Sequence, residues 1–295
     1  MCANCGCQGD EATLHDLQTG ETTTIGPEHR HEDDHHHPHD HDHDHHDHHH
    51  HGPQRNTGED RGHAQRIEPE AAVNIVDVET RILKKNDELA ARNRAWFAGR
   101  EILALNLVSS PGAGKTALLE RTIRDLAGEL PLYVIEGDQA TANDGERIRR
   151  AGAAAVQVNT GTGCHLDAEM VMRALSALKP AAGTVVLIEN VGNLVCPALF
   201  DLGERAKVVI FPVTDGEDKP LKYPHMFAAA ATVVFNKIDL LPHLDFSLAE
   251  AAANVAKVNP DAKILQVSAR SGRGMADWYE WLRAQRAAAR QSAFA

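Results

Sequence analysis

The sequence predicts an α/β fold, with a mostly parallel sheet covered by helices on both faces and a disordered, histidine-rich tail before it. From residue 71 onward, short apolar runs alternate with stretches of helical periodicity, which is typical of βαβ units. Before that point the 295-residue chain is rich in His, Asp, Gly and Thr and poor in large apolar side chains. Burial there cannot offset the entropy of ordering. The expected organisation is a cysteine motif at 1–7, a disordered tail and linker at 8–70, and one domain at 71–295.

The domain is expected to begin with a helix over 71–98, where apolar residues recur at helical spacing before Gly99. A continuous apolar run at 102–110 then indicates a strand buried on both faces. Further strands are expected at 132–136, 154–158, 184–189, 207–213, 232–236 and 263–268. Helices are expected between and after them, at 139–151, 166–178, 247–258 and 274–291.

A glycine-rich segment, SSPGAGKT, follows the first apolar run and precedes a helical stretch. It matches the P-loop pattern G-x-x-x-x-G-K-[ST], except that Ser109 occupies the first glycine position. Small residues let backbone N–H groups wrap a phosphate, while Lys115 suits the β- and γ-phosphates and the Thr116 hydroxyl suits Mg²⁺. The sequence therefore predicts a P-loop NTPase, with nucleotide contacts from Gly112, Ala113, Gly114, Lys115, Thr116 and Ala117.

Two later segments, NKID and VSARSG, indicate which base the nucleotide carries. Asp239 can accept hydrogen bonds from two adjacent N–H donors of guanine that adenine lacks. Asn236 can bind either the base edge or the P-loop, and the Lys237 stem can cover the ring. The backbone N–H groups of Ser268 and Ala269 fit the guanine oxygen. We therefore expect GTP and GDP as ligands.

Two carboxylates are expected to serve Mg²⁺, because they follow strands beside the P-loop: Asp138 in VIEGD and Glu189 in VVLIE. Gly192, three residues beyond Glu189, can donate its N–H to the γ-phosphate. No glutamine is evident to orient the attacking water, which suggests slow turnover or help from a partner. The expected catalytic residues are Lys115, Thr116, Asp138 and Glu189, with Thr116 and Asp138 as magnesium ligands.

The first seven residues, MCANCGC, combine C-x-x-C with C-x-C. Three thiolates from Cys2, Cys5 and Cys7, with the terminal amine if Met1 is removed, suit planar Ni²⁺ or tetrahedral Zn²⁺. Incidental cysteines in a disordered tail are the alternative interpretation.

A tract rich in histidine lies within the tail. Fourteen of the 19 histidines fall between His29 and His51, mixed with seven acidic residues. Many imidazoles in a flexible chain bind several ions weakly, so the tract is interpreted as a metal sponge, a metal-delivery arm or a polar spacer. Its expected metal ligands are His35, His36, His37, His39, His41, His43, His45, His46, His48, His49, His50 and His51.

A second set of metal-ligating residues lies inside the domain. Cys164 and His165 stand side by side just before a predicted helix, and Cys196 lies four residues beyond Gly192. Two thiolates and an imidazole form an incomplete, borderline-soft site that a second subunit could complete. Because Cys196 shares a loop with Gly192, metal and nucleotide could be coupled. The alternative is a small buried cysteine and a capping histidine.

The bulk composition limits the classes of partner. A net charge of −12 argues against nucleic-acid binding, which needs a basic patch. No apolar run approaches the ~18 residues of a membrane span, and the N-terminus lacks the pattern of a secretory signal. We therefore expect a cytoplasmic protein, in which the five cysteines are reduced and suited to metal rather than to disulfides.

Taken together, these segments resemble the hydrogenase nickel-incorporation GTPases, the HypB family. The similarity covers nearly all of 71–295 and the first seven residues, and its motifs are highly specific. The segments that carry it are MCANCGC, NLVSSPGAGKT, VIEGDQAT, VNTGTGCHLDAEM, LIENVGNLVCP, GEDKPLKYPHMF and FNKIDLLP.

The resemblance implies a GTPase that helps load nickel into [NiFe]-hydrogenase precursors, with a P-loop fold of the dimerising signal-recognition class. It also implies that Ser109 is the usual residue at its position, and that Leu240 and Leu244 contact a second copy in a homodimer. The implied partners are a second nickel-insertion chaperone, a nickel-binding prolyl isomerase and the hydrogenase large-subunit precursor.

The resemblance implies two metal sites of different strength. Nickel would be held tightly by the first set of cysteines, Cys2, Cys5 and Cys7. A weaker nickel or zinc site, at or near a dimer interface, would be formed by Cys164, His165 and Cys196.

Two other functions remain open. The chain could be a metal store whose GTPase domain is incidental, which the histidine tract favours. It could also be the GTPase that matures urease, although the N-terminal cysteines and the 71–98 helix argue against that.

Overall fold

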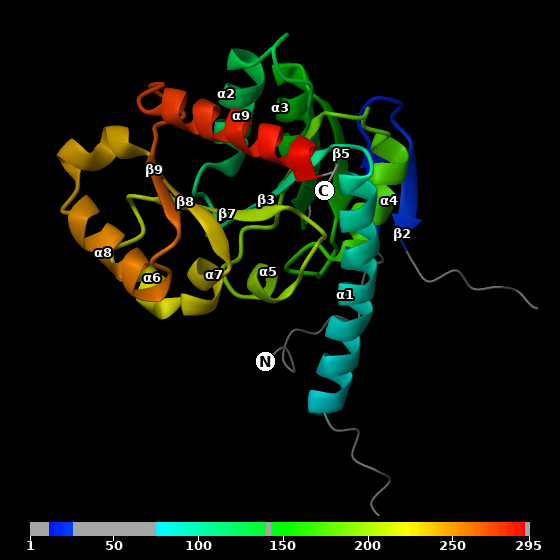
Figure 1. Ribbon diagram of the computed structural model, residues 1–295, viewed down its shortest axis with the longest axis horizontal. Coiled ribbons are helices and arrows are strands. Elements are labelled where there is room, and N and C mark those ends of the chain that lie inside the picture. Colours follow the sequence, from blue (N-terminus) through cyan, green and yellow to red (C-terminus); the bar gives the residue numbers. More distant parts are fainter. Residues whose placement is uncertain (1–11, 26–74, 140–142, 293–295) are drawn as a thin grey trace, which may run out of the picture. The chain divides into compact units, whose positions relative to one another are not determined.

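The computed structural model describes residues 12–25, 75–139 and 143–292. In this part of the chain a nine-stranded sheet has the order β2-β1-β5-β4-β6-β3-β7-β8-β9 (Figure 1). The seven strands β3 to β9 are parallel to one another. The other two strands, β1 and β2, pair antiparallel at the β5 edge of the sheet. The predicted α/β fold with a mostly parallel sheet is confirmed.

Every strand predicted from an apolar run is present. The central strand β3 has all seven residues buried, because helices cover it on both faces and neighbouring strands flank it. The parallel strands are β3 (Leu103–Ser109), β4 (Leu132–Asp138), β5 (Ala154–Asn159), β6 (Val185–Glu189), β7 (Ala206–Pro212), β8 (Ala230–Asn236) and β9 (Lys263–Gln266).

Helices cover both faces of the sheet. On one face the apolar cluster joins β3 to α2, α3 and α9, and its largest buried side chain is Trp278. On the other face, alternate β3 residues such as Ala104 and Val108 belong to clusters that include α1, α4, α7 and α8. The main helices are α1 (Ile75–Ala98), α2 (Lys115–Asp125), α3 (Asn143–Ala151), α4 (Ala168–Leu178), α8 (Leu248–Val258) and α9 (Met275–Ser292).

Four short helical segments were not predicted. They lie in the connections around β6, β7 and β8, where one or two turns leave too short a pattern to recognise. They are α5 (Cys196–Leu199), α6 (Lys219–Lys222), α7 (Pro224–Ala228) and the 3₁₀ segment η1 (Ile238–His243).

The prediction of disorder over the first ~70 residues is wrong for residues 12–25, which form a β-hairpin. β1 (Ala12–Asp16) pairs with β2 (Thr22–Ile25) and also, antiparallel, with β5. Leu14 is buried in the cluster beneath α1 and α4, which gives the strand an apolar anchor. Asp16 accepts hydrogen bonds from two turn N–H groups, and Gly20 has a φ of 78°. The remaining residues of the expected tail lie outside the described part.

Helix α1 contacts the sheet through a stripe that differs from the apolar pattern in the sequence. Ile82 is 52% exposed, whereas the buried residues are Asn86, Ala90, Asn93 and Phe97, at helical spacing. The two asparagines can be buried because their amides form hydrogen bonds with backbone groups at the start of α4 and in the segment before β7. Asn93 Nδ2 donates to Ala168 O (2.8 Å) and Leu202 O (3.0 Å), and Asn86 Oδ1 accepts from the Ala168 N–H (2.9 Å).

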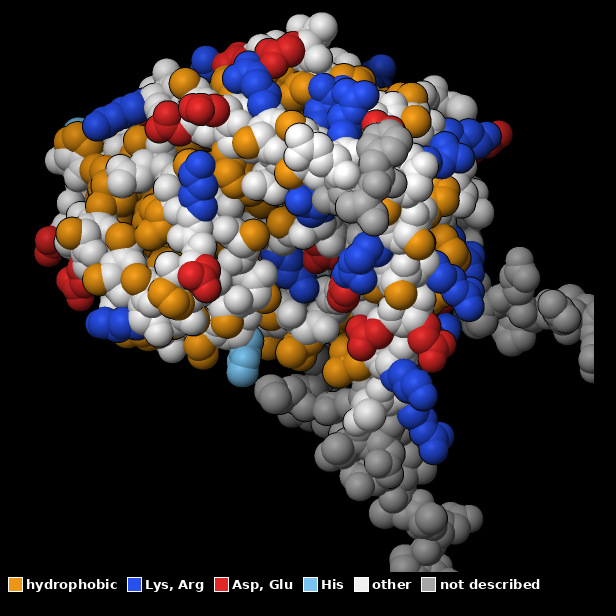
Figure 2. All heavy atoms as spheres, in the orientation of Figure 1, with side chains coloured by type: hydrophobic (Ala, Val, Ile, Leu, Met, Phe, Trp, Pro, Cys, Tyr) orange, Lys and Arg blue, Asp and Glu red, His pale blue; other side chains and the backbone are white. Residues whose placement is uncertain are grey.

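The exposed face seen in Figure 2 carries basic and acidic side chains interspersed with apolar ones. Several of these charges form ion pairs between elements, including Arg283 with Glu129 and Arg290 with Glu101. Because the partners are exposed, solvent screens each pair and its contribution to stability is small. Among the described helices, none is long and apolar enough to cross a membrane.

The close approach of Gly203 to α1 leads to a stability prediction. Gly203 has a φ of 86°, and a Cβ there would lie 2.5 Å from Ala90 O. Gly128 has a similar φ of 82° but no atom within 4 Å of such a Cβ. We expect Gly203→Ala to lower the free energy of unfolding by about 3 kcal/mol or more, and Gly128→Ala by only about 1 kcal/mol. Urea unfolding of both variants measures this; equal losses would contradict the packing of Gly203 against α1.

Candidate nucleotide and metal site

The P-loop connects β3 to α2 at the carboxyl edge of the sheet. Gly112 and Gly114 have φ values of 69° and 92°, which only glycine adopts without strain. A Cβ on Gly114 would also lie 2.8 Å from Asn236 Nδ2. Helix α2 begins at Lys115, so its first N–H groups face the loop, an arrangement suited to binding a phosphate.

The two functional side chains of the loop are both buried and hydrogen-bonded. Lys115 Nζ donates to Ser109 Oγ at 2.8 Å, so the serine at the first glycine position supplies an acceptor for the lysine. Burial lowers the pKa of Lys115, while Glu189 and Glu136 act in the opposite direction. The Thr116 hydroxyl donates to Glu189 Oε1 at 2.8 Å, which joins the P-loop to the end of β6.

A cavity of about 400 Å³ lies over the P-loop and the ends of β4 and β6. Four carboxylates line it, and only two basic side chains do. The acidic residues are Glu136, Asp138, Asp144 and Glu189, and the basic residues are Lys115 and Arg147. The cavity therefore combines phosphate-binding backbone with an excess of acidic groups.

The two most buried of these carboxyl groups have raised pKa values. Glu136 is 2% exposed and Glu189 is 4% exposed. Burial, with a contribution from Glu189, raises the pKa of Glu136 to about 9. Burial likewise raises the pKa of Glu189 to about 7, although Lys115 and Thr116 act against it. Oε2 of each has no hydrogen-bond partner among the described residues. Orphaned carboxylate oxygens beside a P-loop fit a Mg²⁺ ion, which prefers oxygen ligands.

The predicted base-binding segments contact each other and the P-loop. Asn236 Nδ2 donates to Ala113 O at 2.9 Å, so of the two roles open to Asn236 the structure shows contact with the P-loop. Lys237 Nζ donates to Gly112 O at 2.7 Å. Ser268 Oγ donates to Asp239 Oδ1 at 2.6 Å, which holds the carboxylate in place. Ala269 N donates to Asn236 Oδ1 at 3.4 Å.

The structure brings Cys164, His165 and Cys196 together. One ligand atom from each lies within 4.8 Å of the others, the requirement for sharing one ion. The two Sγ atoms are 3.0 Å apart, well beyond the ~2.05 Å of a disulfide bond. Burial lowers the pKa of His165, which favours the neutral imidazole that metals bind. The capping residue of α4 is Asp167, so His165 is not needed for that role.

Three side chains connect the loop carrying Cys164 with the nucleotide cavity or with the loop carrying Cys196. Gln139, which lines the cavity, donates from Nε2 to Gly163 O at 3.2 Å. Leu166 N donates to Asn190 Oδ1 at 3.1 Å, and Asn193 Nδ2 donates to Cys164 O at 3.4 Å. Gly192 lies against the P-loop, since a Cβ there would be 2.9 Å from Pro111 Cα.

Five residues of this site were not predicted from the sequence: Glu136, Gln139, Asp144, Arg147 and Asn190. Glu136 was detectable, because it lies two residues before Asp138 and side chains alternate along a strand. Gln139 follows the same strand, and its amide contacts the Cys164 loop. Cys2, Cys5, Cys7 and the histidine tract lie outside the described residues.

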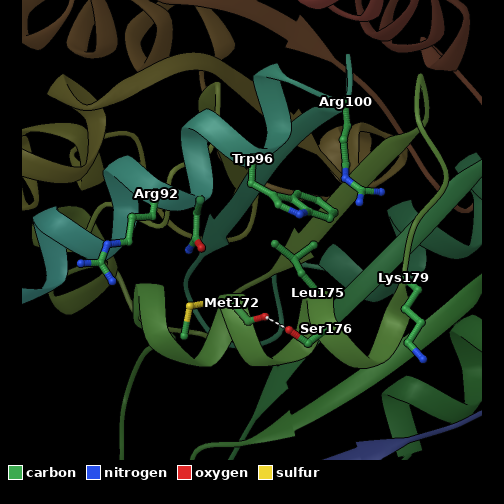
Figure 3. Close-up of a pocket in the computed structure, with 8 residues that line it drawn as sticks. Arg92, Trp96, Arg100, Met172, Leu175, Ser176 and Lys179 are labelled. Carbon is green, nitrogen blue, oxygen red and sulfur yellow. Dashed lines mark hydrogen bonds between the residues drawn. The ribbon is translucent and has the colours of Figure 1, made fainter.

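A second cavity, of about 470 Å³, lies between α1 and α4. Figure 3 shows Trp96 over Leu175, with Met172 on one side of Leu175 and Lys179 on the other. The Arg100 guanidinium stacks on Trp96, with its carbon 4.6 Å from the ring centroid. The lining residues include no carboxylate, cysteine or histidine, so this groove lacks the ligands of a metal site.

The fold and this site define a P-loop nucleotide-binding protein. Residues 103–266 match the family described as CobW/HypB/UreG, nucleotide-binding domain. The chain is 60% identical over 208 residues to the hydrogenase maturation factor HypB of Rhizobium leguminosarum bv. viciae, with 70% of each chain covered. It is 49% identical over 288 residues to that of Azotobacter vinelandii, covering 97% of this chain and 93% of the other. The chain belongs to the CobW/HypB/UreG family and, within it, to the HypB proteins.

Solved structures agree with this assignment. HypB from Archaeoglobus fulgidus superposes with a TM-score of 0.65 at 37% identity, covering 69% of this chain and 99% of that one. HypB from Helicobacter pylori in complex with nickel gives a TM-score of 0.65 at 35% identity, covering 68% of this chain and 95% of that one.

The buried acids predict how stability depends on pH. Because the pKa of Glu136 is raised from 4.5 to about 9, the folded protein binds more protons than the unfolded chain within that window. The resulting stability is present below pH 4.5 and is lost as pH rises towards 9. Without metal or nucleotide, the wild type should lose more unfolding free energy than Glu136→Gln between about pH 6 and about pH 9, by up to about 1.4 kcal/mol per pH unit. Urea titrations in EDTA measure this, and parallel pH profiles would contradict it.

Proposed function

We propose that this protein is a GTP-hydrolysing nickel metallochaperone that stores nickel and delivers it to the [NiFe]-hydrogenase precursor. Its relatives are named hydrogenase maturation factors, and one solved relative is a complex with nickel. The single observation that carries the proposal is the direct contact between residues of the nucleotide cavity and the loop bearing Cys164 and His165.

At the nucleotide end, the P-loop N–H groups and Lys115 bind the β- and γ-phosphates. Thr116, Asp138 and Glu189 would hold Mg²⁺, which supplies positive charge to the transferring phosphate when bound. Gly192 packs against Pro111 of the P-loop, which supports donation of its N–H to the γ-phosphate. These side chains orient the phosphates and neutralise developing charge, which is the main contribution a protein makes to this reaction.

Guanine is the proposed base. Asp239 is held by Ser268, and its carboxylate accepts from the two N–H groups on one guanine edge. Asn236 acts on the P-loop rather than on the base, so the base-binding segment and the phosphate-binding segment form one unit. GTP and GDP are therefore the proposed ligands.

At the metal end, Cys164, His165 and Cys196 bind nickel as cargo, with zinc as a competing ion. Three protein ligands leave the coordination incomplete, and a second copy of the chain would complete it. Val195 and Leu199, beside Cys196, are 46% and 50% exposed, which suits burial against another subunit. Leu244 is 38% exposed and Leu240 is partly buried, so the proposed dimer contact falls mainly on Leu244.

The proposal includes a nickel reservoir in the histidine tract, a tight site at Cys2, Cys5 and Cys7, and a cytoplasmic location where thiols stay reduced. The proposed partners are a second nickel-insertion chaperone, a nickel-binding prolyl isomerase and the hydrogenase large-subunit precursor.

Supply of nickel to urease is a second candidate function. A relative from Helicobacter pylori, 35% identical over 228 residues, is named hydrogenase/urease maturation factor HypB. Assays of both enzymes in a strain that lacks this chain would distinguish the two functions.

Asp239→Asn tests the guanine assignment. The amide offers guanine one acceptor and one mismatched donor, so GTP affinity should fall roughly 10- to 100-fold. Affinity for xanthosine triphosphate should rise, because xanthine has a carbonyl where guanine has its amino group. Fluorescent-nucleotide titration measures both. Ser268→Ala should weaken GTP without improving the xanthine nucleotide, and Asp261→Asn, an exposed site, should change neither; unchanged GTP affinity in Asp239→Asn would contradict the assignment.

The coupling of nucleotide and nickel is tested on the full-length protein. Nickel affinity is measured by competition with a chromophoric chelator, with GDP and with a non-hydrolysable GTP analogue. The nickel affinity of the internal site is obtained from the difference in nickel binding between the wild type and Cys164→Ala. We expect the two nucleotides to change this affinity by roughly 10-fold, in the range usual for coupled sites. Equal affinities would show that the sites are independent.

A matched pair of glutamine variants then tests the contact itself. Gln139→Glu removes the amide that donates to Gly163 O and should reduce the nucleotide dependence of nickel affinity. Gln266→Glu makes the same change on an exposed β9 residue and should leave it unaltered.

A further inference from the structure

Glu136 is a buried acid with one carboxyl oxygen that no described residue hydrogen-bonds. It lies near the end of β4 in the wall of the nucleotide cavity, 2% exposed. Its Oε2 makes no hydrogen bond with any described residue. A carboxyl buried in this way costs free energy unless a ligand compensates it.

The strand register places Glu136 beside Glu189. The two residues are direct partners across the parallel pair β4–β6, two residues beyond Val134 and Leu187 and therefore on the same face of the sheet. Val134 and Leu187 belong to the cluster under α2 and α3, so the next residues on that side point to the same face. The two carboxyls therefore project together towards the P-loop.

The charges around this pair are unbalanced. Asp144 has its own partner, since Arg147 Nη1 donates to it at 2.7 Å. Glu189 uses only Oε1, which accepts from Thr116, and its Oε2 is also without a partner. Lys115 acts on both glutamates and also donates to Ser109, while Arg147 acts on Glu189 but is paired with Glu120 and Asp144. Both cations are shared with other partners, so the two buried carboxyls lack full charge compensation, which a cation that prefers oxygen ligands would supply.

We propose that Glu136 belongs to the magnesium site of this pocket, where it faces Glu189 and binds the water shell of the ion that accompanies the nucleotide. Mg²⁺ keeps several of its waters in proteins, and these waters need acceptors at fixed positions. Glu136 is a positioning residue that holds the hydrated ion against Thr116 and Glu189. The inference rests on the proposed nucleotide site and adds a residue to it.

The competing account is a neutral, purely structural acid. A protonated carboxyl also carries a donor, and Oε2 of Glu136 has neither a donor nor an acceptor within reach. Glutamine has nearly the same shape and no charge, so it would replace such an acid without functional loss. The two accounts therefore differ in the effect of Glu136→Gln.

The test measures the Mg²⁺ dependence of GDP binding with a fluorescent GDP analogue. For Glu136→Gln we expect the Mg²⁺ concentration at half-maximal effect to rise roughly 10-fold, the usual consequence of losing a group that positions a metal's ligands. GDP affinity in EDTA should stay as in the wild type. Electron paramagnetic resonance of Mn²⁺ with GDP gives a second readout, in which the variant should bind the ion correspondingly less tightly.

Glu146→Gln is the matched control, because it removes one carboxylate from the surface of α3, where Glu146 pairs with Arg149. It should leave the Mg²⁺ dependence unchanged. Glu136→Gln should unfold at least as late as the wild type without ligands, which excludes misfolding. If Glu136→Gln keeps the wild-type Mg²⁺ dependence, the role of Glu136 is overturned while the nucleotide site stands. If the wild-type protein itself binds GDP without any effect of Mg²⁺, or does not bind it, the proposed function fails as well.

Discussion

The amide of Asn190 is the interaction on which the arrangement of both sites depends. Asn190 follows Glu189 at the end of β6 and is 1% exposed. Its Oδ1 accepts from Leu166 N and from its neighbour's N–H, while its Nδ2 donates to Asn106 Oδ1 at 3.2 Å. Asn106 in turn donates to Glu204 Oε1 at 3.1 Å. A side-chain amide has two N–H donors and an oxygen that accepts two hydrogen bonds, so it can pair with polar groups of several buried segments at once. Such hydrogen bonds are strong because the buried surroundings have a low dielectric constant.

Around Asn190, the nucleotide cavity and the group of metal-ligating residues lie at the same edge of the sheet. Oxygen ligands and backbone N–H groups gather where β3, β4 and β6 end, and the softer sulfur and nitrogen ligands gather one loop away. Gly192 has no room to move towards Pro111, because even a single carbon atom would collide there. The P-loop and the segment that leads to Cys196 are therefore in close contact at this point.

The parallel strands were predictable because each is a continuous apolar run, the pattern that burial on both faces requires. The hairpin at 12–25 was not, because its strands are short and rich in threonine, and only Leu14 is buried. Within the site, contiguous motifs identified the P-loop and NKID. Glu136 and Gln139 were missed because their importance comes from strand register and from a contact across loops, which no local pattern displays. In α1, Asn86 and Asn93 are buried and Ile82 is exposed. The asparagine amides are needed on the buried side because backbone groups such as Ala168 O require hydrogen-bond partners.

The hairpin also changes which strand lies at the edge of the sheet beside the Cys164 loop. Thr13 pairs with Asn159, so the start of β1 lies where β5 ends and the loop to Cys164 begins. Because the pairing is antiparallel, β1 continues the sheet beyond β5 and forms backbone hydrogen bonds along it. The residue from which the Cys164 loop departs is therefore held inside the sheet rather than at its free edge.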